Sequence, residues 1–307
     1  MSVTVRGAHV SGLRKPPLRL DLDNASVGKR LKRDIQKSFC KNRFPAWEAV
    51  FFIMGITDRL TKHHRERFRR QITIPEFGET GQTRLLRSRV LIVGLGGLGS
   101  PALYYLAACG VGEIGIMDAD RVELSNLQRQ ILHGDEDIGK EKTLSARESI
   151  MRLRPDIRLI LYPFRITAAN ASEIIDRYDF VIEATDNFDS KFLINDVCVG
   201  LGKPYSHAGI AGMCGQTMTV VPGKGPCFRC VFDEIPTPGT VKTPSETGVF
   251  GTVPGIFGVI QATEAIKYLI NRGSLLTGRL LTWDALSMTF REIKLPQDLR
   301  CNVCRKV

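Results

Sequence analysis

The sequence predicts an α/β fold in which a doubly wound, mostly parallel sheet is continued by antiparallel strands. Two observations predict this fold. Short apolar runs alternate with helical stretches from residue 89 onward, which is the pattern of a parallel sheet with helices on both faces. After residue 203 the character changes, and two stretches are typical of antiparallel strands with one more helix between them.

The expected elements follow from these runs. Strands are expected at residues 90–93, 114–117, 159–161 and 180–182. Helices are expected at residues 98–109, 140–153, 168–178 and 187–201. The later part is expected to hold antiparallel strands at residues 215–221 and 278–290 and a helix at residues 255–270.

The net charge of +11 is confined to the N-terminal part of the chain. Residues 1–70 hold 17 Lys and Arg against six Asp and Glu, and the remaining residues are balanced. We therefore divide the chain into a basic N-terminal extension, residues 1–64, and one domain, residues 65–307. Because the domain has no basic field of its own, nucleic acid is not expected as a partner. The extension could contact nucleic acid, an acidic partner or a membrane surface, or could simply be solvated.

Apolar runs such as residues 46–56 are well short of the roughly 18 residues that a membrane span needs. The N-terminus also lacks a basic stub followed by an apolar stretch, so no secretory signal is expected. These features predict a cytoplasmic protein with no membrane partner.

A glycine-rich loop of the Rossmann type lies between the first expected strand and its helix. Its glycines are Gly94, Gly96, Gly97 and Gly99, and Asp118 ends the next expected strand. Glycines let the backbone approach phosphate closely, the helix N-terminus supplies N–H groups, and a carboxylate at the position of Asp118 can bind ribose hydroxyls. Dinucleotide dehydrogenases carry the same elements, so the loop alone leaves two nucleotide classes open.

Charged and amide side chains after the loop favour a triphosphate over a nicotinamide. A nicotinamide site has little use for clustered cations, whereas a triphosphate with Mg²⁺ needs them together with a carboxylate for the metal. The residues of this kind are Asp120, Asn126, Arg129, Gln130, Lys142, Asp186 and Asn187.

The order of these motifs resembles the ThiF/MoeB/HesA family of ubiquitin-activating-type adenylyltransferases. The strongest match is the string Ser-Asn-Leu-Gln-Arg-Gln at residues 125–130. The strings at residues 67–72, 185–187 and 261–267 match as well, and so do two C-x-x-C pairs. The matches span about 240 residues in family order, which makes the resemblance specific.

The resemblance implies a role for each matched residue. The loop glycines and Asp118 would hold the ribose and approach the phosphates of ATP, while Asn126, Arg129 and Lys142 would contact the triphosphate. Asp186 would bind Mg²⁺ or approach the α-phosphate through it. Family members are homodimers in which an arginine crosses into the neighbouring site, and that residue would be Arg70. The expected catalytic set is Arg70, Arg129, Lys142 and Asp186, and Asp120, Gln130 and Asn187 complete the nucleotide site.

The chemistry of adenylylation agrees with this set. A carboxylate attacks the α-phosphate and releases pyrophosphate, and it is already ionised at neutral pH, so no general base is required. Catalysis then depends on positioning and charge neutralisation. His133 and His207 are accordingly expected to be structural. Simpler interpretations remain open: Asp120 and Arg129 could form an ion pair, and Lys140 and Lys142 could be solvated lysines at a helix start.

Four of the eight cysteines form two C-x-x-C pairs, Cys227 with Cys230 and Cys301 with Cys304. In a cytosolic protein this pattern favours a metal over disulfides. Four thiolates make a closed tetrahedral Zn²⁺ site with no open position for substrate. We therefore predict structural zinc that fixes the C-terminal tail to the second half of the sheet.

The chain departs from the family pattern at one loop. Many relatives carry a cysteine shortly before the last long helix, and that position falls on Pro244 here. A covalent thioester or acyl-disulfide at this loop is therefore not expected, and Cys198 and Cys214 are the alternative thiols. The sequence ends three residues after Cys304 without a fused sulfur-donating domain, so a separate sulfur donor is expected.

The resemblance implies adenylylation of the C-terminal glycine of a small ubiquitin-like sulfur carrier ending in Gly-Gly, of the MoaD/ThiS type. Such carriers serve molybdopterin, thiamine or related sulfur transfer. Two alternatives stay open at this point. The same chemistry could act on a ribosomally made peptide, or the fold could serve an NAD-dependent oxidoreductase or a non-catalytic binding module.

Overall fold

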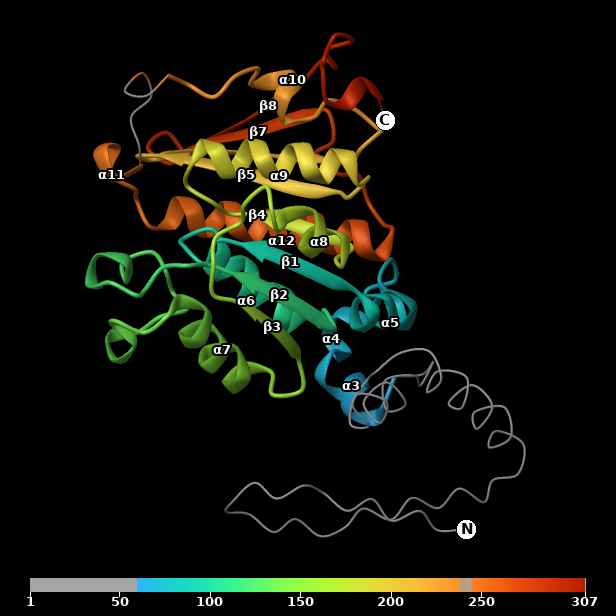
Figure 1. Ribbon diagram of the computed structural model, residues 1–307. Coiled ribbons are helices and arrows are strands. Elements are labelled where there is room, and N and C mark those ends of the chain that lie inside the picture. The colour runs from blue at the N-terminus through green and yellow to red at the C-terminus, as the bar shows by residue number, and fades with distance from the viewer. Residues whose placement is uncertain (1–59, 238–239, 241–243, 307) are drawn as a thin grey trace, which may run out of the picture. The chain divides into compact units, whose positions relative to one another are not determined.

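The computed structural model describes residues 60–237, 240 and 244–306, which belong to one compact unit, Arg59–Val307 (Figure 1). The predicted basic extension lies outside the described residues except for its last five, so the proposed boundary at residue 64 stays a prediction. Within the described part of the chain, no helix is long and apolar enough to cross a membrane.

Eight strands form one sheet in the order β3-β2-β1-β4-β5-β6-β7-β8. The first five are parallel, namely β1 (Arg89–Val93), β2 (Glu113–Met117), β3 (Arg158–Tyr162), β4 (Phe180–Glu183) and β5 (Tyr205–Ala211). The antiparallel strands are β6 (Cys214–Val220), β7 (Arg279–Asp284) and β8 (Thr289–Lys294). The mostly parallel sheet with an antiparallel continuation is therefore confirmed.

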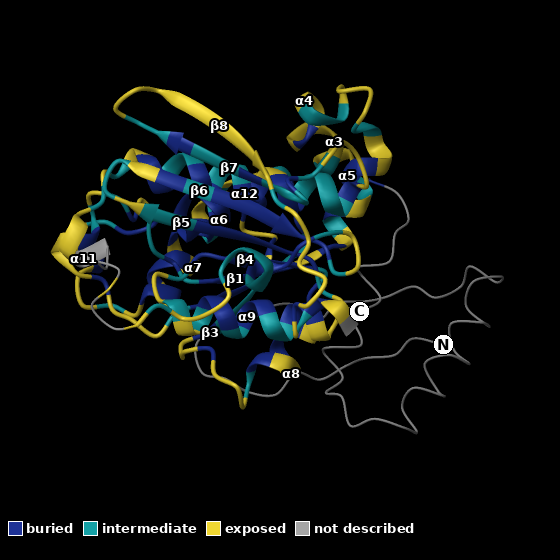
Figure 2. Cartoon of the chain, turned by 90° about the horizontal axis from the view of Figure 1, so that it is seen from above, coloured by how far each residue is buried: buried dark blue, intermediate teal, exposed yellow. Residues whose placement is uncertain are grey.

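Helices cover both faces of this sheet because successive strand residues point to opposite sides. On one face, Ile92 and Ile182 pack with α5 (Gly78–Arg87), α6 (Gly99–Cys109), α7 (Lys142–Leu153) and α12 (Thr252–Ile270). On the other face, Leu91 and Val181 pack with α8 (Ala171–Asp176) and α9 (Phe188–Gly200). Figure 2 shows the buried strands between these layers and the exposed strand β8 at the edge.

The shorter elements lie at the ends of the compact unit and in its loops. Before the sheet come α3 (Lys62–Arg67) and α4 (Arg69–Ile72). The loops carry the 3-10 turns η1 (Leu124–Asn126) and η2 (Asp135–Asp137) and the single-turn helices α10 (Phe228–Val231) and α11 (Pro244–Thr247). The 3-10 turn η3 (Cys304–Lys306) ends the described chain.

Two of the longer elements, β5 and α5, were not predicted from the sequence. Strand β5 has the small and polar sequence Tyr-Ser-His-Ala-Gly-Ile-Ala, and its first six residues are buried or half-buried only because it lies between β4 and β6. No helix was expected at residues 78–87, where the structure has α5. The stretch expected as strand at residues 278–290 is a hairpin of β7 and β8, with Met288 at a φ of 54° in the turn.

The strand order places one crevice where a ligand can bind. Strand β1 lies between β2 and β4, and the chain leaves β1 through α6 on one face but leaves β4 through α9 on the other. The loops after β1 and β4 therefore diverge at the carboxyl edge of the sheet. In open α/β sheets this topological switch point is where ligands bind.

Candidate functional site

At two positions, Gly94 and Gly99, the glycine-rich loop packs so tightly that a side chain would not fit. Gly94 has a φ of 99°, and a Cβ atom there would lie 2.5 Å from the carbonyl oxygen of Ala184 in the loop after β4. A Cβ atom on Gly99 would lie 1.9 Å from the carbonyl oxygen of Gly94. The loop thus folds back on itself and presents the N-terminus of the 11-residue helix α6 to the crevice, which suits a phosphate group.

Asp118 fixes the loop from the end of β2. Its Oδ2 atom accepts a hydrogen bond of 2.7 Å from the backbone N–H of Leu95, and Oδ1 accepts one of 2.8 Å from Asp120. Burial raises the pKa of the Asp118 carboxyl group, and the charge of Lys142 opposes this shift. Each carboxylate oxygen keeps a second lone pair, so Asp118 can still accept from a ribose hydroxyl.

Lys142 begins α7 and is buried beside Asp118 and Asp120. Only 6% of Lys142 is exposed, and its Nζ atom lies 3.1 Å from Oδ2 of Asp120. Arg165 lies 3.7 Å from the other carboxylate oxygen of Asp120. Two simpler interpretations are therefore wrong, because Asp120 pairs with Lys142 and Arg165 instead of Arg129, and Lys142 is not a solvated lysine.

The segment after β2 adds an amide and a cation to the same site. Arg129 is half-buried, donates to the carbonyl of Ser125 over 3.0 Å, and packs beside Gly97. Gln130 is buried with its Oε1 atom unpaired within the described chain, and its Nε2 atom lies 3.8 Å from where a Cβ atom on Gly96 would be. A buried unpaired amide beside an open glycine is a feature that a bound ligand would satisfy.

Asn126 is also buried here, at the end of η1. Its Oδ1 atom accepts a long hydrogen bond of 3.3 Å from the backbone N–H of Glu123, and its Nδ2 atom lies 3.4 Å from the hydroxyl of Ser125. Asn126 thus shapes the turn that carries Arg129.

The loop after β4 brings Asp186 and Asn187 to the same edge. Asp186 is exposed, and its carboxylate has no partner within the described residues. Asn187 is the N-cap of α9, where its Oδ1 atom accepts a hydrogen bond of 2.9 Å from the backbone N–H of Ser190. The structure therefore gives Asn187 a helix-capping role and leaves Asp186 exposed just after the carboxyl end of β4.

Among the residues predicted for the nucleotide site, Arg70 is the one that the structure does not bring to this group. It lies in α4, whose Gln71 donates to the carbonyl of Cys109 at the last residue of α6. Helix α6 has 11 residues and is therefore about 16 Å long, with Gly99 at its other end. Arg70 lines a separate pocket of about 290 Å³ next to Ala108.

The four predicted cysteine ligands meet in one cluster. The Sγ atoms of Cys227, Cys230, Cys301 and Cys304 all lie within 4.8 Å of one another. The separations are 3.7 Å from Cys227 to Cys301, 3.4 Å from Cys230 to Cys304 and 4.0 Å from Cys227 to Cys230. A tetrahedral zinc shell with Zn–S bonds of about 2.3 Å places its sulfurs about 3.8 Å apart. The cluster therefore fits a closed four-thiolate metal site.

Sequence reasoning missed a buried ionic group behind Asp186. Glu183 ends β4 with none of its surface exposed, Lys191 from α9 contacts both of its carboxylate oxygens, and His207 from β5 contacts one. An acidic residue closing an apolar run and a lysine one turn into the next helix were the available signals. His207 joins this pair through β5, which the sequence did not predict.

The fold and the site together define the class of protein: an α/β nucleotide-binding protein with a four-cysteine cluster beside its sheet. The chain belongs to the ThiF family, whose sequence model matches residues 68–303. The resemblance seen in the motifs is thereby confirmed.

Several proteins of known name are similar over most of this chain. A sulfur carrier protein adenylyltransferase of Thermus thermophilus is 44% identical over 251 residues, which cover 80% of this chain and 93% of that protein. A SAMP-activating enzyme E1 of Haloferax volcanii is 47% identical over 239 residues, which cover 78% of this chain and 88% of that enzyme. The probable adenylyltransferase/sulfurtransferase MoeZ of Mycobacterium tuberculosis is 42% identical, covering 78% of this chain and 62% of MoeZ.

Solved structures with the same fold include MccB of E. coli. One MccB crystal structure has a TM-score of 0.70 and 19% identity, and it covers 93% of this chain and 90% of MccB. Another MccB structure, with succinimide, has a TM-score of 0.66 and 22% identity, and it covers 74% of this chain and 69% of MccB. At this identity the similarity shows the fold alone.

Proposed function

We propose that this protein uses ATP to adenylylate the C-terminal glycine carboxylate of a small ubiquitin-like sulfur-carrier protein. The observation that carries the proposal is the buried Lys142 beside Asp120 and Asp118, because Asp118 also binds the backbone of the glycine-rich loop through Leu95. A lysine and a helix N-terminus together suit a polyphosphate and not a nicotinamide. The relatives at 44% and 47% identity, named for sulfur carrier and SAMP activation, support this substrate class.

In the proposed reaction the carrier carboxylate forms a bond to the α-phosphorus while the bond to the β-phosphate bridging oxygen breaks. Asp118 holds the ribose, and Lys142 and Arg129 neutralise the phosphate charge that grows on the departing pyrophosphate. Because the attacking carboxylate is already ionised, no side chain has to accept a proton. The two histidines of this region already have partners in the protein, since Nδ1 of His133 lies 2.7 Å from the hydroxyl of Ser145 and Nδ1 of His207 lies 2.7 Å from Oε2 of Glu183. Burial lowers the pKa of both rings.

Asp186 is proposed as the carboxylate for Mg²⁺. Its exposed carboxylate at the switch point suits a hard cation, and Mg²⁺ would supply further neutralisation of the phosphates. The four cysteines are proposed to hold one structural Zn²⁺, since four thiolates leave no open coordination position for a substrate.

Arg70 is proposed to act in a second copy of the chain. It lies near the far end of α6 from its own glycine loop, so a catalytic role requires a homodimer in which it enters the partner's site. Its exposed position beside a pocket in the described surface supports such a contact.

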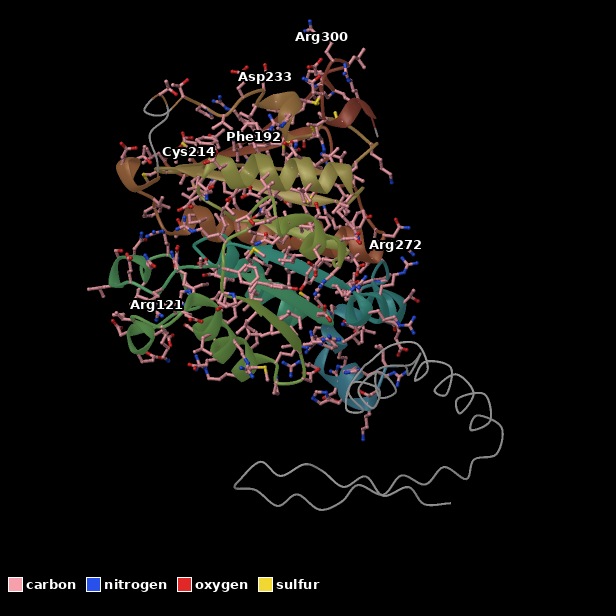
Figure 3. The ribbon with its side chains drawn as sticks, viewed as in Figure 1. Arg121, Phe192, Cys214, Asp233, Arg272 and Arg300 are labelled. Carbon is pink, nitrogen blue, oxygen red and sulfur yellow. The ribbon has the colours of Figure 1, made fainter. Side chains whose placement is uncertain are left out.

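The carrier acyl-adenylate, bound without a covalent bond to the enzyme, is proposed as the last intermediate formed here, with sulfur supplied by a separate donor. The position expected for a loop cysteine is Pro244, the first residue of α11. Cys198 is fully buried and burial raises its pKa well above the ordinary value, so it is a poor nucleophile. Cys214 is exposed and pairs with Ala211 at the carboxyl edge of the sheet, which leaves it as the thiol to test (Figure 3).

The proposal is tested by exchange of labelled pyrophosphate into ATP with purified protein and a Gly-Gly-ended carrier. Exchange is expected with the intact carrier and not with a carrier lacking its last glycine. Exchange without any carrier, or oxidation of a nicotinamide cofactor in its place, would contradict it.

A further inference from the structure

The loop that carries Asp186 is held by a charged side chain buried directly beneath it. Oε1 of Glu183 accepts hydrogen bonds from both the backbone N–H and the hydroxyl of Thr185, over 2.8 Å and 2.5 Å. Thr185 immediately precedes Asp186, so the position of the Glu183 carboxylate sets the path of the chain into Asp186.

The Glu183 carboxylate is in turn fixed by two other elements. Nζ of Lys191, in α9, lies 3.1 Å and 2.9 Å from its two oxygens and also donates to the carbonyl of Ala208 over 2.8 Å. Nδ1 of His207, in β5, lies 2.7 Å from Oε2. Although burial opposes ionisation, Lys191 and His207 lower the pKa of Glu183 to about 2, so the carboxylate stays charged.

The surrounding backbone is fixed as well. Gln261 of α12 donates to the carbonyl oxygens of Glu183 and Ser206 over 2.8 Å and 2.9 Å, which ties β4 to β5 at the end of their ladder. On the other side of Asp186, Asn187 caps α9. Within the segment 184–187, Thr185 and Asn187 are thus engaged in the protein, and the Asp186 carboxylate is free to bind a ligand.

A buried ion pair of this kind is weak evidence for added stability, because removing two charges from water offsets most of their attraction. Its location gives a better reason for its presence. The Glu183–Lys191 pair lies where β4 ends at the switch point. The Glu183 carboxylate accepts two hydrogen bonds from Thr185, the residue next to Asp186.

We propose that Lys191 is a positioning residue that, through Glu183 and Thr185, holds Asp186 in its catalytic orientation. The proposal rests on the function proposed above for Asp186. Without the ammonium group, Glu183 loses its main partner, and its hydrogen bonds to Thr185 weaken. Asp186 then shifts relative to the glycine loop, whose Gly94 packs against Ala184. A displacement of about 1 Å at a catalytic group can cost about 100-fold in rate.

The test compares Lys191→Met with Lys191→Arg in carrier-dependent pyrophosphate exchange. Lys191→Met is expected to lower kcat by about 10- to 100-fold while the KM for ATP changes by less than about threefold, and Lys191→Arg is expected to restore most of kcat. The matched control is Lys203→Met, which removes an ion pair to Asp176 just after the same helix and is expected to keep full activity. A folded Lys191→Met protein with wild-type kcat would overturn the proposal.

Two further measurements separate positioning from general stability and from the proposed function. Thr185→Val removes one hydrogen bond without exposing a buried charge, and it is expected to lower kcat by about three- to tenfold with an unchanged melting temperature. If Lys191→Met does not fold, Thr185→Val tests the positioning role in its place. Full activity of Thr185→Val would contradict the proposal. Amide hydrogen exchange in residues 184–190 is expected to speed up in Lys191→Met but not in Lys203→Met. This readout holds even for an enzyme whose carrier substrate was misassigned, and equal exchange in the two variants would count against the positioning role.

Discussion

Lys142 lies 3.1 Å from Asp120 with only 6% of its surface exposed, although it is the first residue of α7 and Asp120 stands in the exposed loop after β2. Holding a lysine here in the absence of substrate requires a nearby negative charge, and Asp120 supplies it together with Asp118. An incoming triphosphate offers stronger and more numerous acceptors than one exposed carboxylate. In the proposed function, the pair keeps the ammonium group where the phosphates would bind.

Lys142→Ala is expected to lower kcat/KM for pyrophosphate exchange by at least about 100-fold, because the charge that faces the triphosphate is lost. The control is Lys140→Ala, two residues earlier, whose Nζ atom pairs with Asp137 and Glu148 outside this group. That variant is expected to remain within about threefold of the wild type. Equal losses in the two variants would mean that Lys142 acts only on stability.

The four-cysteine cluster is expected to hold one zinc ion per chain, measured by elemental analysis of freshly purified protein. Cys230→Ser breaks the shell and is expected to abolish stoichiometric metal and to lower the melting temperature, since metal binding and folding are linked. Cys109→Ser removes a thiol outside the cluster and is expected to retain the metal. Metal-free wild-type protein would contradict the assignment.

Arg70→Ala and Asp186→Ala subunits are each expected to be inactive alone and to regain activity when mixed. In the heterodimer one site combines an intact Asp186 with the partner's intact arginine. Exchange of subunits is followed by native mass spectrometry of differently tagged chains. Mixtures that exchange subunits and yet stay inactive would show that Arg70 does not act across the interface.

No covalent enzyme–carrier adduct is expected when enzyme, carrier, ATP and a sulfur source are incubated and examined by non-reducing mass spectrometry. Pro244 has no thiol, and Cys198 is buried. Cys214→Ser is accordingly expected to keep full adenylylation activity. An adduct that disappears on reduction, and maps to Cys214, would assign that residue a covalent role.

The sequence predicted those features whose cause lies in neighbouring residues, such as the glycine-rich loop and the C-x-x-C pairs. The glycines of the loop are there because the backbone turns tightly, and Asp118 follows a strand whose apolar run is unambiguous. The C-x-x-C spacing likewise fixes half of the metal shell within each pair. From such patterns the parallel sheet, the nucleotide loop and the meeting of the four cysteines could be expected.

Features that depend on neighbours distant in the sequence could not be predicted. Strand β5 is buried by its place in the sheet and not by its composition. The group of Glu183, Lys191 and His207 joins three elements through that strand. The sequence left open whether Lys142 was a solvated lysine, and the fold excludes this because it places Asp120 beside it.

The central claim is tested most directly by intact mass spectrometry of the carrier after brief incubation with enzyme, ATP and Mg²⁺, without a sulfur donor. The account predicts that AMP becomes attached to the carrier at its C-terminal glycine, and that neither Lys142→Ala nor Asp186→Ala enzyme forms this product. A carrier that stays unmodified with folded wild-type enzyme, or AMP attached elsewhere on the carrier, would contradict this account.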